Sequence, residues 1–199
     1  GALEIDTFKA FEPELTVHSI FETFDHTSPN HEANPIKHET LKDLSAEVLR
    51  TKADIGVAFD GDADRVGFVD EKGNPIASDI IGILLTQYIL EKNPGQTVVY
   101  DIRSTRALKE EIERLGGVPV REKVGHTNIK TTMRKHQAIL GVELSGHFFF
   151  KEAYYCEGGA LPVFYILELI KQTGKPLSEL TQSVKKYVQS GEINSTVTQ

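Results

Sequence analysis

"ADIGVAFDGDADRVGFVDEKGNPI", residues 53–76, is the stretch that decides the fold of the N-terminal half of the chain. Residues 53–60 are mostly apolar or β-branched and predict a strand, and residues 65–76, with Lys-Gly-Asn inside them, predict a hairpin. Between them lies an acidic turn with aspartates at positions 60, 62 and 64. These aspartates follow a strand directly, and α/β folds place their ligand sites beyond the carboxyl ends of strands.

The composition is typical of a globular protein. Of the 199 residues, 39% are apolar, which is enough to form the core of one large or two small domains. Lys and Arg number 22 against 29 Asp and Glu, giving a net charge of −7, and no long basic run is present to bind a polyanion. No apolar stretch approaches the roughly 20 residues of a membrane helix. We therefore expect no nucleic-acid and no membrane partner.

The cysteine content and the N-terminus indicate a compartment. Cys156 is the one cysteine, so it forms no intrachain disulfide and has no cysteine partner for a zinc site, which is typical of a reducing environment. The first thirty residues are too acidic for a signal peptide. We expect the protein to be cytoplasmic.

Strands and helices alternate along the rest of the chain. A helix is predicted from Asp79, its expected N-cap, to the stop signal Asn93-Pro94-Gly95. The further predicted segments are strands at 97–101, 118–124 and 138–144, helices at 105–116, 127–136 and 160–172, and an aromatic segment at 147–150. This alternation predicts the α/β class, with two α/β/α domains built on mostly parallel mixed sheets.

The domain boundary is expected near Pro94-Gly95. This gives domains at 1–94 and 95–188, with a linker at 189–199. The N-terminal residues enter a helix-like segment almost at once, and the last residues are polar and complete no element. We therefore expect the chain to be a piece of a larger protein.

The acidic turn predicts a metal site. Asp60, Asp62 and Asp64 can direct three carboxylates at one hard cation, and oxygen ligands suit Mg²⁺ or Ca²⁺ better than zinc. Arg65 follows them, and its guanidinium can bind a phosphate in bidentate fashion. The plainer alternative is a solvated acidic turn, which seldom closes an apolar strand with Asp-Gly-Asp.

Two other protein classes share part of this pattern. In an EF-hand loop the aspartates would occupy the first, third and fifth positions and Glu71 the twelfth, but Arg65 stands where that loop needs glycine and a strand precedes it instead of a helix. A haloacid-dehalogenase-like phosphatase also has a strand followed by Asp-x-Asp, with Asp60 as the nucleophile. The phosphatase stays open as an alternative.

"GVELSGHFFFKE", residues 141–152, contains the second candidate site. Glu143, Ser145 and His147 alternate beside a predicted strand and offer the acceptors and donors that sugar hydroxyls and anionic oxygens require. A plain Ser-Gly-His turn is the competing interpretation. The three phenylalanines at 148–150 are expected to pack in the core.

Two strand-to-helix turns form the third candidate site. His126 stands before a predicted helix start with Lys130 one turn later, and both can donate to a phosphate that the helix amides attract. Arg103 and Arg106 lie at a similar turn. Capped helices with basic faces are equally compatible with these segments. The remaining histidines have no ligand spacing and are expected to be structural: His18, His26, His31, His38 and His136.

Together these motifs resemble the α-D-phosphohexomutases, the superfamily of phosphomannomutase and phosphoglucomutase. "DGDADR" at 60–65 is similar to their metal loop, and "GVELSGH" at 141–147 is similar to their sugar-binding loop. Further similar segments are "SPNHEANP" at 28–35, "DIRSTRAL" at 101–108, "VGHTNIK" at 124–130 and "GEINS" at 191–195. The resemblance extends from about residue 16 to the end of the chain.

The resemblance implies the second and third domains of a four-domain enzyme, with the first strand of the second domain missing. It implies Mg²⁺ on the three aspartates and a hexose phosphate as substrate, with these substrate-binding residues: Arg65, Arg103, His126, Glu143, Ser145 and His147. It also implies transfer from a phosphoserine through a bisphosphate, interconverting hexose 6-phosphate and hexose 1-phosphate. The phosphoserine segment and the phosphate loop of the first and fourth domains are not in this sequence, so we expect the chain alone to be inactive.

Two positions depart from the family pattern. Ala63 replaces a usual glycine, which matters if the backbone φ must be positive there, and Val142 replaces the glycine usually found before the glutamate. A non-catalytic module that binds sugar phosphate and Mg²⁺ also stays open beside the mutase, because such a module would lack the nucleophile but keep the ligand cleft. The preferred hexose is also open, because epimers differ by a single hydroxyl.

Overall fold

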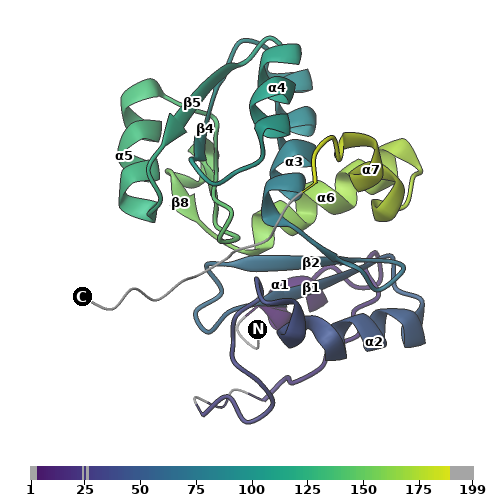
Figure 1. Ribbon diagram of the computed structural model, residues 1–199. Helices are drawn as coiled ribbons and strands as arrows, with labels where there is room; N and C mark the ends of the chain where they lie inside the picture. The colour runs from purple at the N-terminus through teal and green to yellow at the C-terminus, as the bar shows by residue number, and fades with distance from the viewer. Residues whose placement is uncertain (1–3, 24, 26, 189–199) are drawn as a thin grey trace.

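The computed structural model describes residues 4–23, 25 and 27–188. Its helices are α1 (Ile5–Lys9), α2 (Lys42–Thr51), α3 (Ser78–Lys92), α4 (Arg106–Arg114), α5 (His126–His136), α6 (Ala160–Thr173) and α7 (Leu177–Val184), with 3-10 helices η1 (His38–Leu41) and η2 (Lys151–Ala153). Its strands are β1 (Ile55–Phe59), β2 (Val66–Asp70), β3 (Pro75–Ile76), β4 (Thr97–Asp101), β5 (Val118–Glu122), β6 (Leu140–Val142), β7 (Phe148–Phe150) and β8 (Cys156–Glu157). Figure 1 shows two stacked units, one around β1 and β2 and one around β4 and β5.

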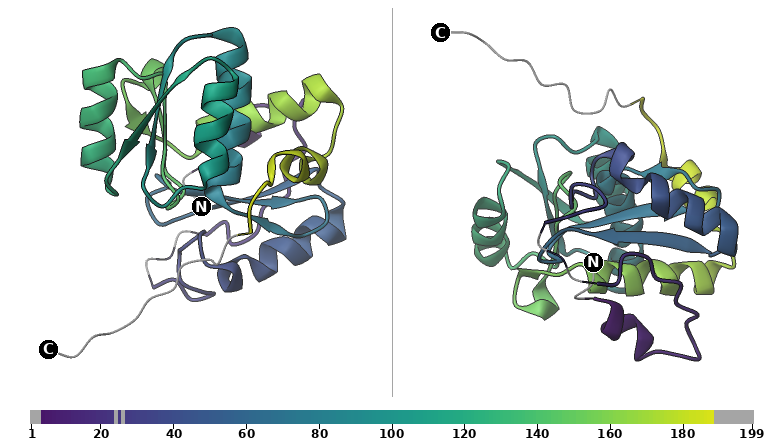
Figure 2. Two further views of the ribbon diagram at one scale, coloured as in Figure 1. Left: turned by 45° about the horizontal axis from the view of Figure 1, so that its top comes forward. Right: turned by 90° about the horizontal axis from the view of Figure 1, so that it is seen from below.

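The first sheet is an antiparallel meander of β1, β2 and β3. Phe59 pairs with Val66, so the acidic turn is the loop that closes the β1–β2 hairpin. The predicted Lys-Gly-Asn hairpin is confirmed, and Gly73 takes φ 79°, a left-handed conformation that glycine adopts without steric cost. α2 lies along one side of β1 and β2 and α6 along the other, as the right view of Figure 2 shows. This unit therefore has helix, sheet and helix layers.

The second sheet has the order β5-β4-β6-β7-β8. β4 runs parallel to β5 and to β6, whereas β6–β7 and β7–β8 are antiparallel. The α/β class and the mixed sheet are confirmed. The expectation of mostly parallel pairing is wrong in detail, because residues 143–147 join β6 to β7 by a tight turn and a parallel crossover needs a dozen residues or more.

Most predicted elements occur within a few residues of their expected bounds. The elements that were not predicted from the sequence are α2, α7, β8 and the 3-10 helices η1 and η2. The N-cap position of α3 is Ala77, not Asp79, which is buried in the first turn. Its Oδ2 atom accepts a hydrogen bond from the backbone N–H of Thr105 at 2.8 Å, so Asp79 links α3 to the start of α4.

The largest of three hydrophobic clusters among the described residues joins the two units. β2 is buried along its whole length, and its Phe68 belongs to the same cluster as Leu84 of α3 and Phe148 of β7. α3 is apolar on all sides because it contacts β2, β6, α4, α6 and α7. The division at residue 94 stays a prediction, and α3, which precedes it, packs on elements of both units.

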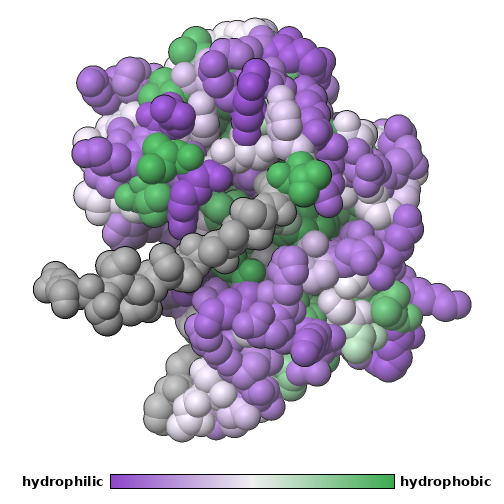
Figure 3. Space-filling view, viewed as in Figure 1, coloured by the Kyte–Doolittle hydropathy of each residue, from purple (hydrophilic) through white to green (hydrophobic). Residues whose placement is uncertain are grey.

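On the face shown in Figure 3, the apolar side chains of the described residues form separate patches among hydrophilic ones. Within the described part of the chain, no helix combines the length and the apolar character needed to cross a bilayer. α3, the longest helix of the described residues, has 15 residues and is covered by its neighbours.

Candidate functional site

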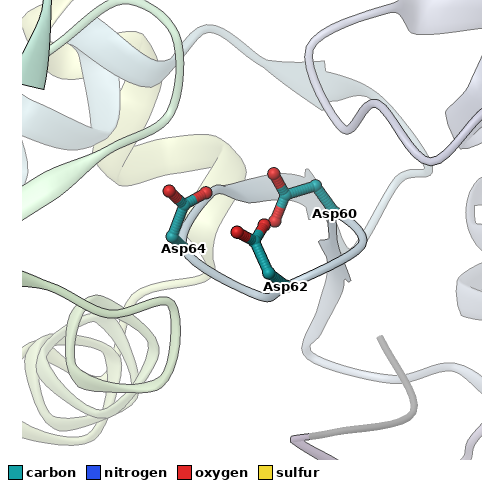
Figure 4. Close-up of side chains that lie close together, drawn as sticks. All are labelled: Asp60, Asp62 and Asp64. Carbon is teal, nitrogen blue, oxygen red and sulfur yellow. The ribbon is translucent and has the colours of Figure 1, made fainter.

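The β1–β2 loop gathers three carboxylates. One carboxylate oxygen from each of Asp60, Asp62 and Asp64 lies within 4.8 Å of the others, and the side chains project from one loop toward one another (Figure 4). Two oxygens on opposite sides of a Mg²⁺ ion are about 4 Å apart, since each bond is about 2.0–2.1 Å. The cluster is therefore close to the size that a small cation requires, and all its donors are hard oxygens.

Asp60 anchors the loop to Arg65. The carboxylate of Asp60 is 2% exposed and accepts hydrogen bonds from the backbone N–H of Arg65 at 3.2 Å and from its Nε at 2.6 Å. Burial opposes ionisation of Asp60, but the hydrogen bonds from Arg65 outweigh it and hold the pKa below its ordinary value. Asp60 is thus a carboxylate near neutral pH.

Asp64 reaches the sugar-loop candidate. Its Oδ2 atom lies 3.3 Å from Nε2 of His147, whose side chain is 16% exposed. Burial, together with the charges of Asp60 and Asp62, raises the pKa of Asp64 against the attraction of His147. Carboxylates crowded in this way are the charge pattern that a cation relieves.

Ala63 takes the left-handed conformation, with φ 63°. The positive φ means that having alanine here, where the family usually has glycine, has an energetic cost. The left-handed conformation costs about 1–2 kcal/mol for a residue with a Cβ. The carbonyl of Ala63 accepts a hydrogen bond from the N–H of Gly159 at 3.1 Å. A Cβ on Gly159 would lie 2.6 Å from the Phe59 ring, so glycine at 159 permits this close approach of the second unit.

Residues 143–147 form the turn between β6 and β7. Gly146 has φ 89°, and its carbonyl accepts from the N–H of Val66, the first residue of β2, at 3.1 Å. Val142 is buried in β6, paired with Tyr100 and Phe148, so a side chain at this position fits a regular strand. The turn is therefore fixed to both the second sheet and the β1–β2 hairpin that carries the acidic loop.

The polar side chains of this turn contact one another. Glu143 is 1% exposed and accepts from the N–H of Gly125 at 2.8 Å. Ser145 Oγ lies 2.9 Å from Nδ1 of His147, and Glu143 Oε2 lies 3.4 Å from the same nitrogen. The structure thus joins Glu143, Ser145 and His147 in one polar group, and the phenylalanines at 148–150 are buried, as predicted.

Arg103 lies at the carboxyl end of β4, held by Asp101. Its Nη2 and Nε donate to Asp101 Oδ2 at 2.8 and 3.2 Å. Asp101 also accepts from the N–H of Leu144 at 3.1 Å, which ties this strand end to the turn at 143–147. Sequence reasoning missed Asp101, whose only signal is its position as the last residue of a buried strand. Arg106, in contrast, pairs with Glu110 on the exposed face of α4.

The start of α5 contributes two basic side chains. Lys130 Nζ lies 2.5 Å from Oε2 of Glu157, and His126 Nδ1 lies 3.5 Å from Oε1 of the same residue. Burial disfavours the charge of Glu157, but the hydrogen bond from Lys130 and the nearby cations hold its pKa below the ordinary value. Glu157 was also missed from the sequence. Of the expected structural histidines, His31 contacts Phe21, whereas His26 lies outside the described residues.

With the exception of Arg106, the predicted site residues thus lie at the carboxyl ends of β1, β4, β5 and β6, at the junction of the two units. Hydrogen bonds and ion pairs connect Asp64 to His147, Glu143 to Gly125 beside His126, and Leu144 to Asp101 beside Arg103. Oxygen ligands, basic side chains and neutral donors converge there. Such an arrangement can bind a cation, an anionic group and hydroxyls together.

Known proteins are similar to this chain in sequence and in fold. Residues 6–73 match the family model described as phosphoglucomutase/phosphomannomutase, alpha/beta/alpha domain II, and residues 77–187 match domain III of the same family. A phosphomannomutase of Methanocaldococcus jannaschii is 40% identical over 166 residues, which are 83% of this chain and 37% of that protein. A phosphomannomutase of Escherichia coli is 38% identical over 193 residues, 96% of this chain and 42% of that protein.

A crystal structure of a phosphoglucomutase/phosphomannomutase family protein from Burkholderia thailandensis superposes with a TM-score of 0.80 at 36% identity, over 85% of this chain and 37% of that one. The chain thus spans about two fifths of the length of the curated relatives it matches, which are covered to 37–42%. The two family models together match nearly all of the described residues. The chain belongs to the phosphoglucomutase/phosphomannomutase family.

Proposed function

We propose that this chain is the central part of a phosphohexomutase, binds Mg²⁺ and a hexose phosphate at the junction of its two units, and serves the interconversion of hexose 6-phosphate and hexose 1-phosphate. Family membership supports the reaction class. The observation that carries the proposal is the 3.3 Å approach of His147 Nε2 to Asp64 Oδ2, which joins the acidic loop to the candidate sugar loop.

Asp60, Asp62 and Asp64 would hold the metal. Their carboxylate oxygens fit a hard divalent cation in chemistry and in spacing, and we assign it as Mg²⁺. A bound Mg²⁺ would offset the negative charge of a phosphoryl group in transfer. Arg65 stands beside the cluster, where its guanidinium orients a phosphate and neutralises part of its charge.

The second unit would bind the sugar. Glu143 is the proposed acceptor for a sugar hydroxyl, Ser145 can accept or donate, and His147, between the two loops, is the proposed donor to an anionic oxygen. Arg103 and His126, at neighbouring strand ends, add hydrogen-bond donors for the second phosphate of a bisphosphate. Mannose and glucose phosphates are both candidates for this site.

The phosphoserine that donates the phosphoryl group belongs, in this proposal, to a part of the protein outside these residues, as does the final phosphate-binding loop. Every phosphoryl step needs that serine. The isolated chain would therefore bind metal and hexose phosphate without turning substrate over. We propose a cytoplasmic location for the protein.

Calorimetric titration of Mg²⁺ into the chain tests the metal site. We expect Asp62→Asn to lower the Mg²⁺ affinity by tenfold or more, on the order of one lost charged ligand. Asp54→Asn is the matched control, because Asp54 is an exposed aspartate at the opposite end of β1. Equal affinities in both variants would contradict the assignment.

An assay of generic phosphate-ester hydrolysis separates the mutase fragment from the aspartyl-phosphate phosphatase. We expect no hydrolysis by the chain, whereas the phosphatase requires hydrolysis that Asp60→Asn abolishes. A hydrolytic rate above background in the purified chain, lost in that variant, would overturn the mutase interpretation.

A further inference from the structure

Asp101 is a completely buried carboxylate, 0% exposed, at the end of β4. Its Oδ1 atom accepts hydrogen bonds from the N–H of Arg103 at 3.0 Å, the N–H of Ser104 at 3.0 Å and the Oγ of Ser104 at 3.1 Å. Its Oδ2 atom accepts from Nη2 and Nε of Arg103 and from the N–H of Leu144. Six donors from two separate loops therefore converge on one carboxylate.

The two oxygens have different roles. Oδ1 closes the turn that follows β4, as aspartates commonly do after strands. Oδ2 fixes the guanidinium of Arg103 and, 43 residues further along the chain, the backbone between Glu143 and Ser145. One rigid, charged acceptor thus sets the direction of the Arg103 side chain and the position of the turn at 143–147 together.

Asp70 shows what a purely structural aspartate does in the same fold. It is also buried at the end of a strand, and in the described structure its carboxylate accepts from Lys72 N and from the N and Nδ2 of Asn74, within its own hairpin. Asp101 differs because it reaches a second loop and a charged side chain of the candidate site. Turn formation alone does not require the contacts of Oδ2.

We propose that Asp101 is a positioning residue that couples the phosphate-binding and sugar-binding parts of the site. The inference rests on the proposed function. By engaging two of the N–H groups of Arg103, Asp101 fixes the guanidinium so that its other N–H groups can donate to a phosphate. By holding Leu144, it sets Glu143 and Ser145 at a fixed distance from that phosphate, so that one hexose phosphate meets both sets of donors.

The test uses Asp101→Asn in the full chain, with Asp70→Asn as the matched control. The amide keeps the shape of the carboxylate but loses its charge and places an N–H₂ group against the donors of Arg103 or Leu144. NMR follows the Leu144 and Ser145 amide signals and the Arg103 Nε–H signal. Calorimetry gives the affinities for glucose 1-phosphate and mannose 1-phosphate.

We expect Asp101→Asn to shift those signals and to lower the hexose phosphate affinity by about tenfold, roughly the contribution of one charged hydrogen bond. Arg103→Ala should lower the hexose phosphate affinity in the wild-type chain. In the Asp101→Asn background it should cause little further loss of affinity, because a displaced guanidinium already contributes little to binding. Asp70→Asn should lower stability without changing affinity.

Additive effects of Asp101→Asn and Arg103→Ala, or an equal loss of affinity in Asp70→Asn, would overturn the positioning role. If the wild-type chain binds neither hexose phosphate, the proposed function fails. In that case the NMR signals still decide the coupling: unchanged Leu144 and Arg103 signals in Asp101→Asn contradict it, and displaced signals with an unchanged fold support it.

Discussion

His147 and Asp64 connect the two units of the chain: Nε2 of the imidazole lies 3.3 Å from Oδ2 of the carboxylate. Asp64 belongs to the loop after β1, and His147 belongs to the turn between β6 and β7. Nδ1 of the same ring faces Ser145 and Glu143. His147 therefore contacts the proposed metal cluster with one nitrogen and the proposed sugar-binding residues with the other.

As the pH falls, Mg²⁺ binding should begin to weaken at a higher pH than it would at a cluster of aspartates with ordinary pKa values. Burial and the neighbouring carboxylates raise the pKa of Asp64, so protons compete with the metal as pH falls through that raised value. His147→Ala removes an attraction that lowers this pKa, and should move the midpoint to still higher pH. Mg²⁺ affinities measured between pH 7 and 4 give the midpoint for the wild-type chain and for His147→Ala. Equal midpoints in the two proteins would contradict the role of His147.

Ala63 should tolerate glycine but not a β-branched residue. Ala63→Gly relieves about 1–2 kcal/mol of left-handed backbone strain. It also raises the entropy of the unfolded chain and removes one buried methyl group, and together these destabilise the folded state by a similar amount. The free energy of unfolding should therefore change by less than about 1 kcal/mol. Ala63→Val should destabilise the chain by about 2 kcal/mol or more. The control is Ala77→Val, since Ala77 has φ −64° and ψ 139°. If urea unfolding shows the same loss of unfolding free energy in Ala63→Val and Ala77→Val, backbone strain at Ala63 is not the cause.

Gly159→Ala should separate the two units locally. The added Cβ would lie 2.6 Å from the Phe59 ring and 2.9 Å from the carbonyl of Ala63, which is too close for ordinary contact. We expect a loss of about 1–3 kcal/mol in the free energy of unfolding and a weaker metal site. Gly158→Ala is the neighbouring control, because its Cβ would meet nothing within 4 Å. The prediction fails if both variants unfold at the same urea concentration.

Glu71 should make stability depend on pH. Its carboxylate accepts from the N–H of Ser178 at 3.1 Å and from its Oγ, in the first turn of α7, and so caps that helix from the other unit. Burial opposes ionisation, but these hydrogen bonds hold the pKa of Glu71 below its ordinary value. The stabilisation is therefore fully present above the unfolded-state pKa and is lost as pH falls through the lower folded-state pKa.

The variant Glu71→Gln should cost about 1 kcal/mol of stability at pH 7, the usual worth of a helix cap, and progressively less as the pH falls below about 4. Unfolding curves at pH 7 and pH 3 measure the difference, with the exposed Glu39→Gln as control. A loss that is the same at both pH values would show that the charge of Glu71 is not involved.

The sequence predicted the elements whose signals are local. β1 and the hairpin of β2 and β3 follow from apolar runs and from Lys-Gly-Asn. α4 lies within the predicted helix at 105–116, and the structure adds its N-cap, Thr105, whose hydroxyl accepts from the N–H of Ala107. α2 was missed because its one buried residue, Val48, leaves a mostly polar sequence. The N-cap assignment of Asp79 failed because a long-range partner, Thr105, competes for that carboxylate.

The candidate site shows the same limit. The strand-end positions of Asp60, Arg103 and Glu143 could be predicted, since an acidic or basic residue after an apolar run is visible in the sequence. Asp101 and Glu157 could not, because their roles come from contacts with Leu144 and Lys130, which are far from them in the chain. The left-handed φ of Ala63 could not be predicted from the sequence, because alanine has no preference for that conformation.

The most direct test of the central claim, that the acidic loop and the turn at 143–147 form one site, is the Mg²⁺ affinity of the chain measured with and without saturating hexose 1-phosphate. Ligands that share a site are linked, so each must change the affinity of the other by the same factor. We predict that glucose 1-phosphate or mannose 1-phosphate raises the Mg²⁺ affinity by about fivefold or more, and that Asp62→Asn abolishes this increase. An Mg²⁺ affinity that is identical with and without bound hexose phosphate would contradict the account.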